Sequence, residues 1–352
     1  GQGWLNIPIF TWSLFASSVI QLVATPVLGI TILLLVFEKF FSLGIFDPNL
    51  GGDPILFQHL FWFYSHPVVY VMIVPAMGLI SEIISVFSRK TAFGYTNLVF
   101  SSLVIAFFGL LIWGHHMFVA GQSEFSNFIF TVLTTLVAVP TSVKIFTWLS
   151  TLYRGSIKFD TPFIMSFFFI FLFTIGGLTG LMLNNISLNV WFHDTYYVVA
   201  HFHFILAGSV LYAFFAGLHF FWPKMFGRLY NVKFANIFSF ISFLGFIITF
   251  FSQFILGFQG MPRRYFHYLY QYKFMNRVST LGAILTGLGF FLLILNLVLS
   301  FFNNSKNSAL NLANPWNAKT IDWTETYSPP LEHNFINLPI LKKDEYENCF
   351  KK

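Results

Sequence analysis

The sequence predicts an all-α integral membrane protein, a bundle of about eight transmembrane helices. Hydrophobic residues fill 56% of its 352 positions and charged residues only 9%, whereas soluble domains carry about 25% charged residues. Apolar runs near the ~20 residues that a bilayer requires recur along the chain. They lack the alternation of a membrane β-barrel, so each is expected to be helical. The expected spans are residues 10–37, 57–87, 95–120, 126–153, 163–185, 195–222, 235–258 and 278–302.

Two regions follow from this pattern, a transmembrane domain over residues 1–302 and a polar extramembrane tail over residues 303–352. The tail contains four prolines and is expected to have no core of its own. The net charge of +6 includes no basic block that would indicate nucleic-acid binding. The single cysteine, Cys349, excludes an internal disulfide and any metal site made of several cysteines.

Positive residues concentrate in alternate loops, which the positive-inside rule assigns to the inner face of the membrane. One loop breaks this rule, because Arg263 and Arg264 stand in GMPRRY, in a loop expected on the outer face. Two arginines there predict an anionic partner, since a guanidinium binds a carboxylate through two hydrogen bonds. The inner residues are Arg89, Lys90, Arg154, Lys158, Lys224, Arg228 and Lys233.

Two histidines, His201 and His203, stand within an apolar run long enough to cross a bilayer. A polar, ionisable side chain at that depth is costly and indicates a functional role. Residues two apart on a helix point about 200° away from each other. The two imidazoles therefore cannot share one metal, and as ligands they would place this helix between two redox centres. The alternative is a pair of core histidines hydrogen-bonded to neighbouring helices.

The stretch HLFWFYSHPVVYVMIVP places His66 and Tyr70 four residues apart, on one face of a helix. Pro67 removes a backbone donor and loosens the turn that presents His66. The adjacent pair His115 and His116 follows in WGHHMF. Adjacent residues of a regular helix point about 100° apart, so both can reach one metal only if the helix end is distorted. Imidazole nitrogen suits copper. The alternatives are that His66 is a core histidine beside an aromatic ring, and that His115 and His116 are an interfacial pair.

Other polar groups interrupt the apolar pattern. Thr141 and Lys144 share one face of a helix in VPTSVKIF, where a lysine indicates a proton path or a cavity, unless it extends to the surface. His193 and Asp194 precede the histidine-bearing helix and are expected at the outer mouth of the bundle. One interpretation is that Asp194 caps that helix, since its charge also favours a helix N-terminus.

These motifs, in this order, resemble subunit I of the haem–copper oxidases, the family that includes cytochrome c oxidase. The resemblance runs from about Pro8 to Tyr265, and HDTYYVVAHFHF is similar to the family's tenth transmembrane helix. It implies that His201 binds the high-spin haem iron, where oxygen is reduced, and that His203 binds the low-spin haem iron. It also implies a copper ion held by His66, His115 and His116, and a catalytic tyrosine, Tyr70, bonded covalently to His66 and placed to give an electron and a proton to dioxygen.

The resemblance extends to the outer loops and to proton transfer. It implies that His193 and Asp194 hold magnesium with help from subunit II, and that Arg263 and Arg264 bind haem propionates. Thr141 and Lys144 resemble the family's lysine pathway, which leads toward the active-site tyrosine.

One position departs from the family pattern. Most mitochondrial members place glutamate after the His-Pro dipeptide, as the gate for pumped protons, and this chain has Val68 there. It carries Tyr64 and Ser65 instead, like the oxidase subgroup in which a Tyr-Ser pair replaces the glutamate. Hydroxyls relay protons without storing one near neutral pH. The departure bears on proton pumping and leaves the metal-ligand motifs unchanged.

The chain begins with a segment, PIFTWSLFASSVIQLVATPVLG, that resembles the fifth helix of subunit I. It is therefore expected to be the C-terminal part of a twelve-helix catalytic subunit. Either the protein is made as two fragments, or the numbering covers only its second part. The fragment version implies a partner polypeptide that supplies the first four helices, with the second low-spin haem ligand.

The expected function is that of the catalytic subunit of a terminal oxidase. It would reduce O2 to water with electrons from cytochrome c, coupled to proton translocation, using two haems of a-type, copper and magnesium, and it would work with subunit II. The expected location is the mitochondrial inner membrane, with the bacterial plasma membrane as the alternative. A quinol oxidase remains open. Nitric oxide reductase is disfavoured by Tyr70, and a proton-coupled transporter would explain Lys144 but not the histidines.

Overall fold

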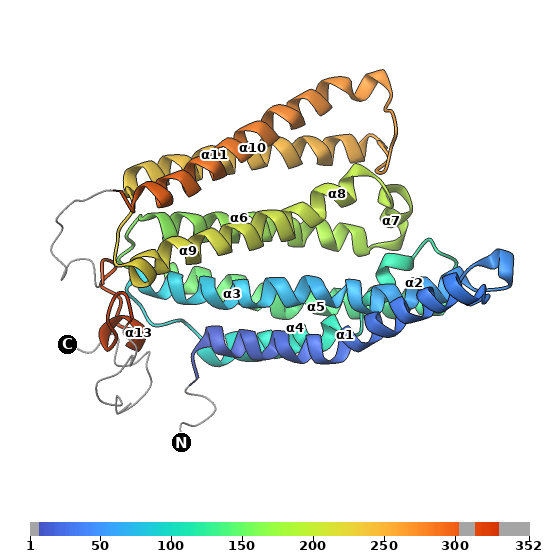
Figure 1. Cartoon of the computed structure of the whole chain (residues 1–352), viewed down its shortest axis with the longest axis horizontal. Helices are drawn as coiled ribbons and strands as arrows, with labels where there is room; N and C mark the ends of the chain where they lie inside the picture. The colour runs from blue at the N-terminus through green and yellow to red at the C-terminus, as the bar shows by residue number, and fades with distance from the viewer. Residues whose placement is uncertain (1–6, 303–313, 331–352) are drawn as a thin grey trace.

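The computed structural model describes residues 7–302 and 314–330. Long helices lie side by side through these ranges, with an isolated β-bridge between Thr195 and Pro262 (Figure 1). In the described residues, seven helical segments have the length and composition to cross a membrane, and Tyr95–Gly109 is a shorter apolar helix. The predicted all-α membrane bundle is therefore confirmed.

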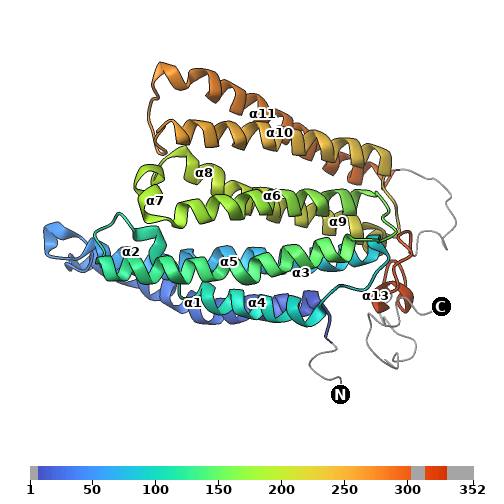
Figure 2. The same ribbon diagram turned by 180° about the vertical axis from the view of Figure 1, so that it is seen from behind.

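The helices form successive layers, from α1 and α4 at one edge to α10 and α11 at the other (Figures 1 and 2). Between these edges lie first α2, α3 and α5, and then α6 to α9. The first half of the chain contains α1 Ile9–Phe41, α2 Pro54–Ser65, α3 Pro67–Ser88, α4 Tyr95–Gly109 and α5 Glu124–Leu152. The second half contains α6 Thr161–Asn184, α7 Ile186–Phe192, α8 Tyr196–His203, a π-helical turn Phe204–Val210, α9 Leu211–Phe226, α10 Val232–Phe258, α11 Lys273–Leu299 and the short α13 Ile321–Thr324.

Three expected spans differ from single regular helices. The segment expected at 195–222 consists of α8, the π-helical turn Phe204–Val210 and α9. The segment expected at 57–87 consists of α2 and α3, which meet at His66. Pro67 explains the break, because its ring lacks the amide donor that a continuous helix needs. The segment expected at 95–120 is α-helical only to Gly109, and a 3-10 turn over Trp113–Met117 follows. All three interruptions lie at, or directly after, histidines expected to bind metals.

The positively charged loops gather at one end of the bundle, as predicted. The Lys90 ammonium donates to the carbonyl of Tyr153 at 2.7 Å, and the Lys158 amide donates to the carbonyl of Phe87 at 3.1 Å. These bonds join the loop after α3 to the loop after α5. We call this end the inner end and the opposite end the outer end.

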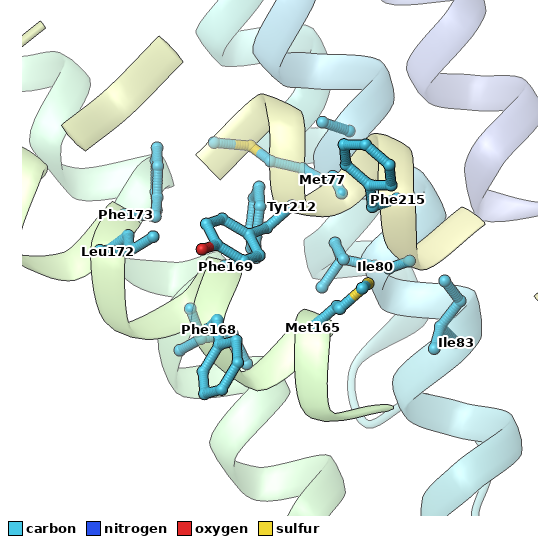
Figure 3. Packing of buried hydrophobic residues seen from close by; sticks show 14 of the residues in the cluster. Met77, Ile80, Ile83, Met165, Phe168, Phe169, Leu172, Phe173, Tyr212 and Phe215 are labelled. Atoms are coloured by element: carbon cyan, nitrogen blue, oxygen red, sulfur yellow. The ribbon is translucent and has the colours of Figure 1, made fainter. Parts of the chain in front are cut away.

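The core lies where α3, α6 and α9 meet. Figure 3 shows Met77 of α3, Met165 and Phe169 of α6, and Tyr212 and Phe215 of α9 gathered in one buried cluster. Large apolar side chains also cover the outside of the bundle, as expected where the solvent is lipid. The core thus packs α3, α6 and α9 together next to the segments that carry the histidines.

The described part of the tail, residues 314–330, packs on the inner end of α9. The Trp316 indole donates to the carbonyl of Phe220 at 2.8 Å, and Trp323 packs edge to face on Phe220. The Lys224 ammonium donates to the carbonyl of Thr326 at 2.9 Å. This segment therefore adds its tryptophans to the core of the bundle. Residues 303–313 and 331–352, with Cys349, lie outside the described residues.

Candidate metal and haem site

Three histidines from two separate parts of the chain meet inside the bundle. His66 lies at the junction of α2 and α3, and His115 and His116 lie in the 3-10 turn Trp113–Met117, called here the ligand turn. One nitrogen from each ring lies within 4.8 Å of the others, so the three side chains form a group able to hold a metal ion. We call it the three-histidine cluster.

The ligand turn has the distortion that the adjacent histidines required. Its five residues are 3-10 rather than α-helical. Consecutive side chains of a 3-10 turn lie about 120° apart, and both imidazoles nevertheless reach His66, with ring centroids 4.5 Å (His115) and 5.2 Å (His116) from its own. Gly114 permits this path, because a Cβ atom there would lie 2.2 Å from the ring of Phe130. Gln122 closes the turn by donating from Nε2 to the Gly114 carbonyl at 2.7 Å.

Each imidazole of the cluster has a neighbour that holds its orientation. His116 stacks on Trp62 with ring centroids 3.8 Å apart, and Nδ1 of His115 lies 3.0 Å from the Thr134 hydroxyl. The sequence analysis missed Trp62 and Thr134. Trp62 stands four residues before His66, on the same face of α2, and that spacing was the available signal. Thr134 comes from α5 and had none.

Buried polar atoms in the cluster fit a copper ion. Nδ1 of His66 lies 3.0 Å from Nε2 of His116, and Nε2 of His66 is buried without a hydrogen-bond partner in the described residues. Buried polar atoms normally have partners, so this atom calls for a ligand. A neutral three-imidazole set suits copper and strands no charge in the membrane.

Tyr70 lies beside the cluster, one helical turn beyond His66. The two ring centroids are 4.8 Å apart. Gly109 at the end of α4 makes room for the tyrosine, because a Cβ atom there would lie 2.8 Å from Cδ2 of Tyr70. The proximity predicted from the four-residue spacing is present, and the phenol is held against the histidine by backbone packing.

His201 faces α6. Its Nδ1 atom lies 3.0 Å from the Gly176 carbonyl and 3.1 Å from the Thr179 hydroxyl. A bond from one ring nitrogen to a backbone carbonyl fixes the tautomer and leaves the other nitrogen free for a metal. His201 also lies within electrostatic range of His115, so its ring belongs to the same region as the three-histidine cluster.

His203 faces α10 instead. Its Nδ1 atom lies 2.7 Å from the carbonyl of Val199, and its ring stacks on Phe250 with centroids 4.3 Å apart. The α8 helix is regular through His203, so the angle of about 200° between the histidines applies. The structure therefore shows the two imidazoles leaving α8 toward different helices, as the spacing predicted.

Gly180 provides a test of the space around His201. A Cβ atom at Gly180 would lie 2.9 Å from Cε1 of His201, whereas one at Gly177 would meet nothing within 4 Å. Overpacking of this kind costs about 1–3 kcal/mol. Gly180→Ala is expected to displace the imidazole and, if His201 binds a haem iron, to shift the absorption band of that haem. Gly177→Ala, one turn away on the same helix, is the matched control, and equal spectra for the two variants would contradict the prediction.

The outer loops bring the two remaining motifs together. Asp194 lies 3.5 Å from Nε2 of His193 and 3.9 Å from Nε of Arg263, and the Arg263 amide donates to the Asp194 carbonyl at 2.8 Å. The Arg263 guanidinium lies 5.8 Å from the ring centre of Phe202. The side chain of Arg264 is exposed. The alternative that Asp194 caps α8 is wrong, because Thr195 is the cap and accepts from the Tyr197 amide.

Lys144 is fully buried between α5 and α4. Its ammonium donates to the Ser102 hydroxyl at 2.7 Å and to the Leu98 carbonyl at 3.2 Å. A lysine that reached the surface would not have these bonds, so that alternative is wrong. The Thr141 hydroxyl, one turn earlier, donates to the carbonyl of Val137. Tyr64 and Ser65 are the last two residues of α2 and are partly buried next to His66.

A family model described as "Cytochrome C and Quinol oxidase polypeptide I" matches residues 1–285. The chain belongs to this family. Membership implies haems and copper, and it agrees with the resemblance read from the histidine motifs.

Several relatives carry the name cytochrome c oxidase subunit 1. The protein from Alkalihalophilus pseudofirmus is 41% identical over 341 residues, which are 96% of this chain and 54% of the relative. The protein from Cereibacter sphaeroides is 41% identical, over 99% of this chain and 61% of its own length. The chain thus spans little more than half the length of these bacterial relatives.

A solved structure supports the fold. The structure of a haem–copper terminal oxidase dimer superposes with a TM-score of 0.74 at 19% sequence identity, covering 98% of this chain and 71% of the solved one. At that identity the likeness concerns the arrangement of helices alone.

Proposed function

We propose that this chain carries the oxygen-reducing centre of a terminal respiratory oxidase that converts O2 to water with electrons from cytochrome c and translocates protons. The observation that carries the proposal is the three-histidine cluster beside Tyr70, with His201 on the neighbouring helix. Family membership supports the same reading.

The residues would divide the work by position. His66, His115 and His116 would hold copper, His201 the high-spin haem iron and His203 the low-spin haem iron. The metals would supply the electron transfer and the binding of dioxygen. Backbone carbonyls fix the tautomers of His201 and His203, and burial excludes bulk water from the three-histidine cluster. Tyr70, within contact of His66, would give a proton and an electron from its hydroxyl.

The polar groups around this centre have proposed roles in proton and charge balance. Lys144 and Thr141 would lie on a path for protons from the inner end, and Tyr64 and Ser65 would relay protons near the copper site. At the outer end, Arg263 and Arg264 would bind haem propionates, and His193 and Asp194 would hold magnesium. The Asp194–Arg263 contact supports a charged outer mouth.

A reduced-minus-oxidised optical spectrum of the purified complex tests the proposal most directly. Two haem signals, one of which shifts on addition of carbon monoxide, are expected, and metal analysis of the same sample is expected to find copper. A spectrum without haem would overturn the proposal and favour a proton-coupled transporter. Non-haem iron in place of copper would favour a nitric oxide reductase.

A quinol oxidase is the second candidate function, because the matched family includes quinol oxidases. The two candidates differ in their electron donor. Oxygen consumption is expected with reduced cytochrome c, and consumption with a quinol alone would favour the second candidate. Other oxidase subunits, among them subunit II, are the proposed partners. The named relatives are bacterial and give the mitochondrial expectation no support, so we propose a bacterial-type plasma membrane.

Lys144→Met is expected to slow oxygen reduction by more than about tenfold, because a proton donor contributes at least that much when its step limits turnover. Methionine keeps the length of the side chain and removes the buried charge, so the fold is expected to persist. Steady-state oxygen consumption at matched haem content measures the effect. Lys90→Met, at the inner end, is the control. Parent-like turnover of Lys144→Met would show that protons reach the site by another path.

A further inference from the structure

One histidine that no proposed ligand set uses, His59, contacts the ligand turn. It lies on α2, two turns before His66. The Trp113 indole Nε1 donates to Nδ1 of His59 across 3.3 Å. His59 therefore carries its own proton on Nε2 and accepts through Nδ1. Trp113 is the first residue of the ligand turn.

His59 belongs to a face of α2 that holds the ligand turn along its whole length. Residues at i, i+3, i+4 and i+7 share one face of a helix. Phe63 packs edge to face on Trp113 at 5.0 Å, Trp62 stacks on His116 at 3.8 Å, and His66 lies 3.0 Å from His116. The first and last members of this face thus contact the first residue of the turn and one of its metal-binding histidines.

The ligand turn depends on such contacts because its backbone has little stability of its own. Its five residues form a 3-10 turn, whose hydrogen bonds are poorer than those of an α-helix. Gln122 holds its middle at the Gly114 carbonyl, and Thr134 holds the ring of His115. At its start, the indole of Trp113 lies between Phe63 and Phe130, which are apolar, and His59 supplies the directional bond.

We infer that His59 is a positioning residue for the copper site, which it reaches through Trp113. The bond between His59 and Trp113 fixes the distance between α2, which presents His66, and the ligand turn, which presents His115 and His116. All three nitrogens must lie at one point to hold one ion, so a displaced turn holds copper less tightly. The inference rests on the proposed function, because it assumes that the cluster binds copper.

Copper retention in the purified complex tests the inference without measuring turnover. The copper-to-haem ratio and the rate of copper loss to a chelator are compared among His59→Leu, His59→Asn, Trp113→Phe and the parent. Leucine keeps apolar bulk and removes the acceptor. Asparagine places an amide oxygen on Cγ, where the histidine carries Nδ1, and so restores the acceptor. His267→Leu is the matched control, since His267 lies in the loop after α10 with its ring against Tyr268.

His59→Leu and Trp113→Phe are each expected to lose copper about tenfold faster than the parent, a size typical of groups that orient metal ligands. His59→Asn and His267→Leu should retain copper as the parent does. The double variant His59→Leu/Trp113→Phe should be no worse than either single variant, because both remove one bond. If His59 had a purely structural role, asparagine would not restore copper retention. His59→Leu would then lower the stability of the complex without the expected ranking of copper loss among the variants.

Three results would overturn the inference. They are parent-like copper retention in His59→Leu, additive losses in the double variant, and equal losses in His59→Asn and His59→Leu. If His59→Leu fails to assemble, Trp113→Phe decides, and parent-like retention there overturns the inference. A parent complex that contains haem but no copper would instead refute the proposed function.

Discussion

His201→Ala is expected to abolish the signal of the high-spin haem, whereas His203→Ala is expected to abolish that of the low-spin haem. The reason is geometric. His201 is held toward α6 by Gly176 and Thr179, and His203 is stacked on Phe250 of α10. Each imidazole therefore serves a different side of α8. Both variants should lose oxygen reduction, so activity alone does not distinguish them.

Optical spectra of the reduced variants, with and without carbon monoxide, make the distinction, because carbon monoxide binds only an iron with an open position. His201→Ala should lose the signal that responds to carbon monoxide, and His203→Ala should keep it. His219→Ala serves as a control for loss of a buried histidine on the same continuous segment, since His219 contacts Tyr230 near the inner end. Identical spectra for the two α8 variants would contradict ligation on opposite sides.

Much of this arrangement could be predicted from local spacing. Positions that share a helix have fixed relative angles, so the contact of His66 with Tyr70 and the divergence of His201 from His203 follow from counting residues. The break at Pro67 follows from its missing amide donor. The distorted turn at His115 and His116 could be predicted because two adjacent side chains of a regular helix cannot reach one point.

Contacts between distant segments could not be predicted in this way. The contacts of His115 with Thr134, of His201 with Gly176 and of His59 with Trp113 each join two different segments of the chain. No periodicity along one helix encodes such partners. The π-helical turn Phe204–Val210 directly after His203 was also missed, because an inserted residue in a helix leaves the apolar composition unchanged.

The length of the third expected span, residues 95–120, and the role of the tail show the same limit. Composition alone favours a helix through residue 120, whereas the chain leaves the α-helix after Gly109, where Tyr70 occupies the space that a side chain would need. Trp316 and Trp323 belong to a polar segment, yet their rings complete the core at the inner end of α9. Only the tertiary structure shows which aromatic residues of a polar segment are buried.

His116→Ala is expected to remove copper while both haems remain. The variant deletes one of three nitrogens that lie within 4.8 Å of one another. It leaves in place the hydrogen-bond contacts of His201 with Gly176 and Thr179 and that of His203 with Val199. Loss of a group that merely orients a ligand costs about 10–100-fold in metal affinity, so loss of the ligand itself should cost more than about 100-fold. Oxygen reduction should fall with the copper content. Metal analysis of the purified complex, with the haem spectrum recorded on the same sample, measures both quantities.

Trp62→Leu provides the matched comparison for this variant, because it removes the ring that stacks on His116 and leaves all three nitrogens in place. It should lower copper affinity by about tenfold, as expected for an orienting group. The ranking follows from the distinction between a ligand and its support. A three-histidine site requires His116→Ala to be the more severe of the two. Full copper occupancy in His116→Ala would mean that the ion is held elsewhere, and the assignment of the cluster would then be wrong.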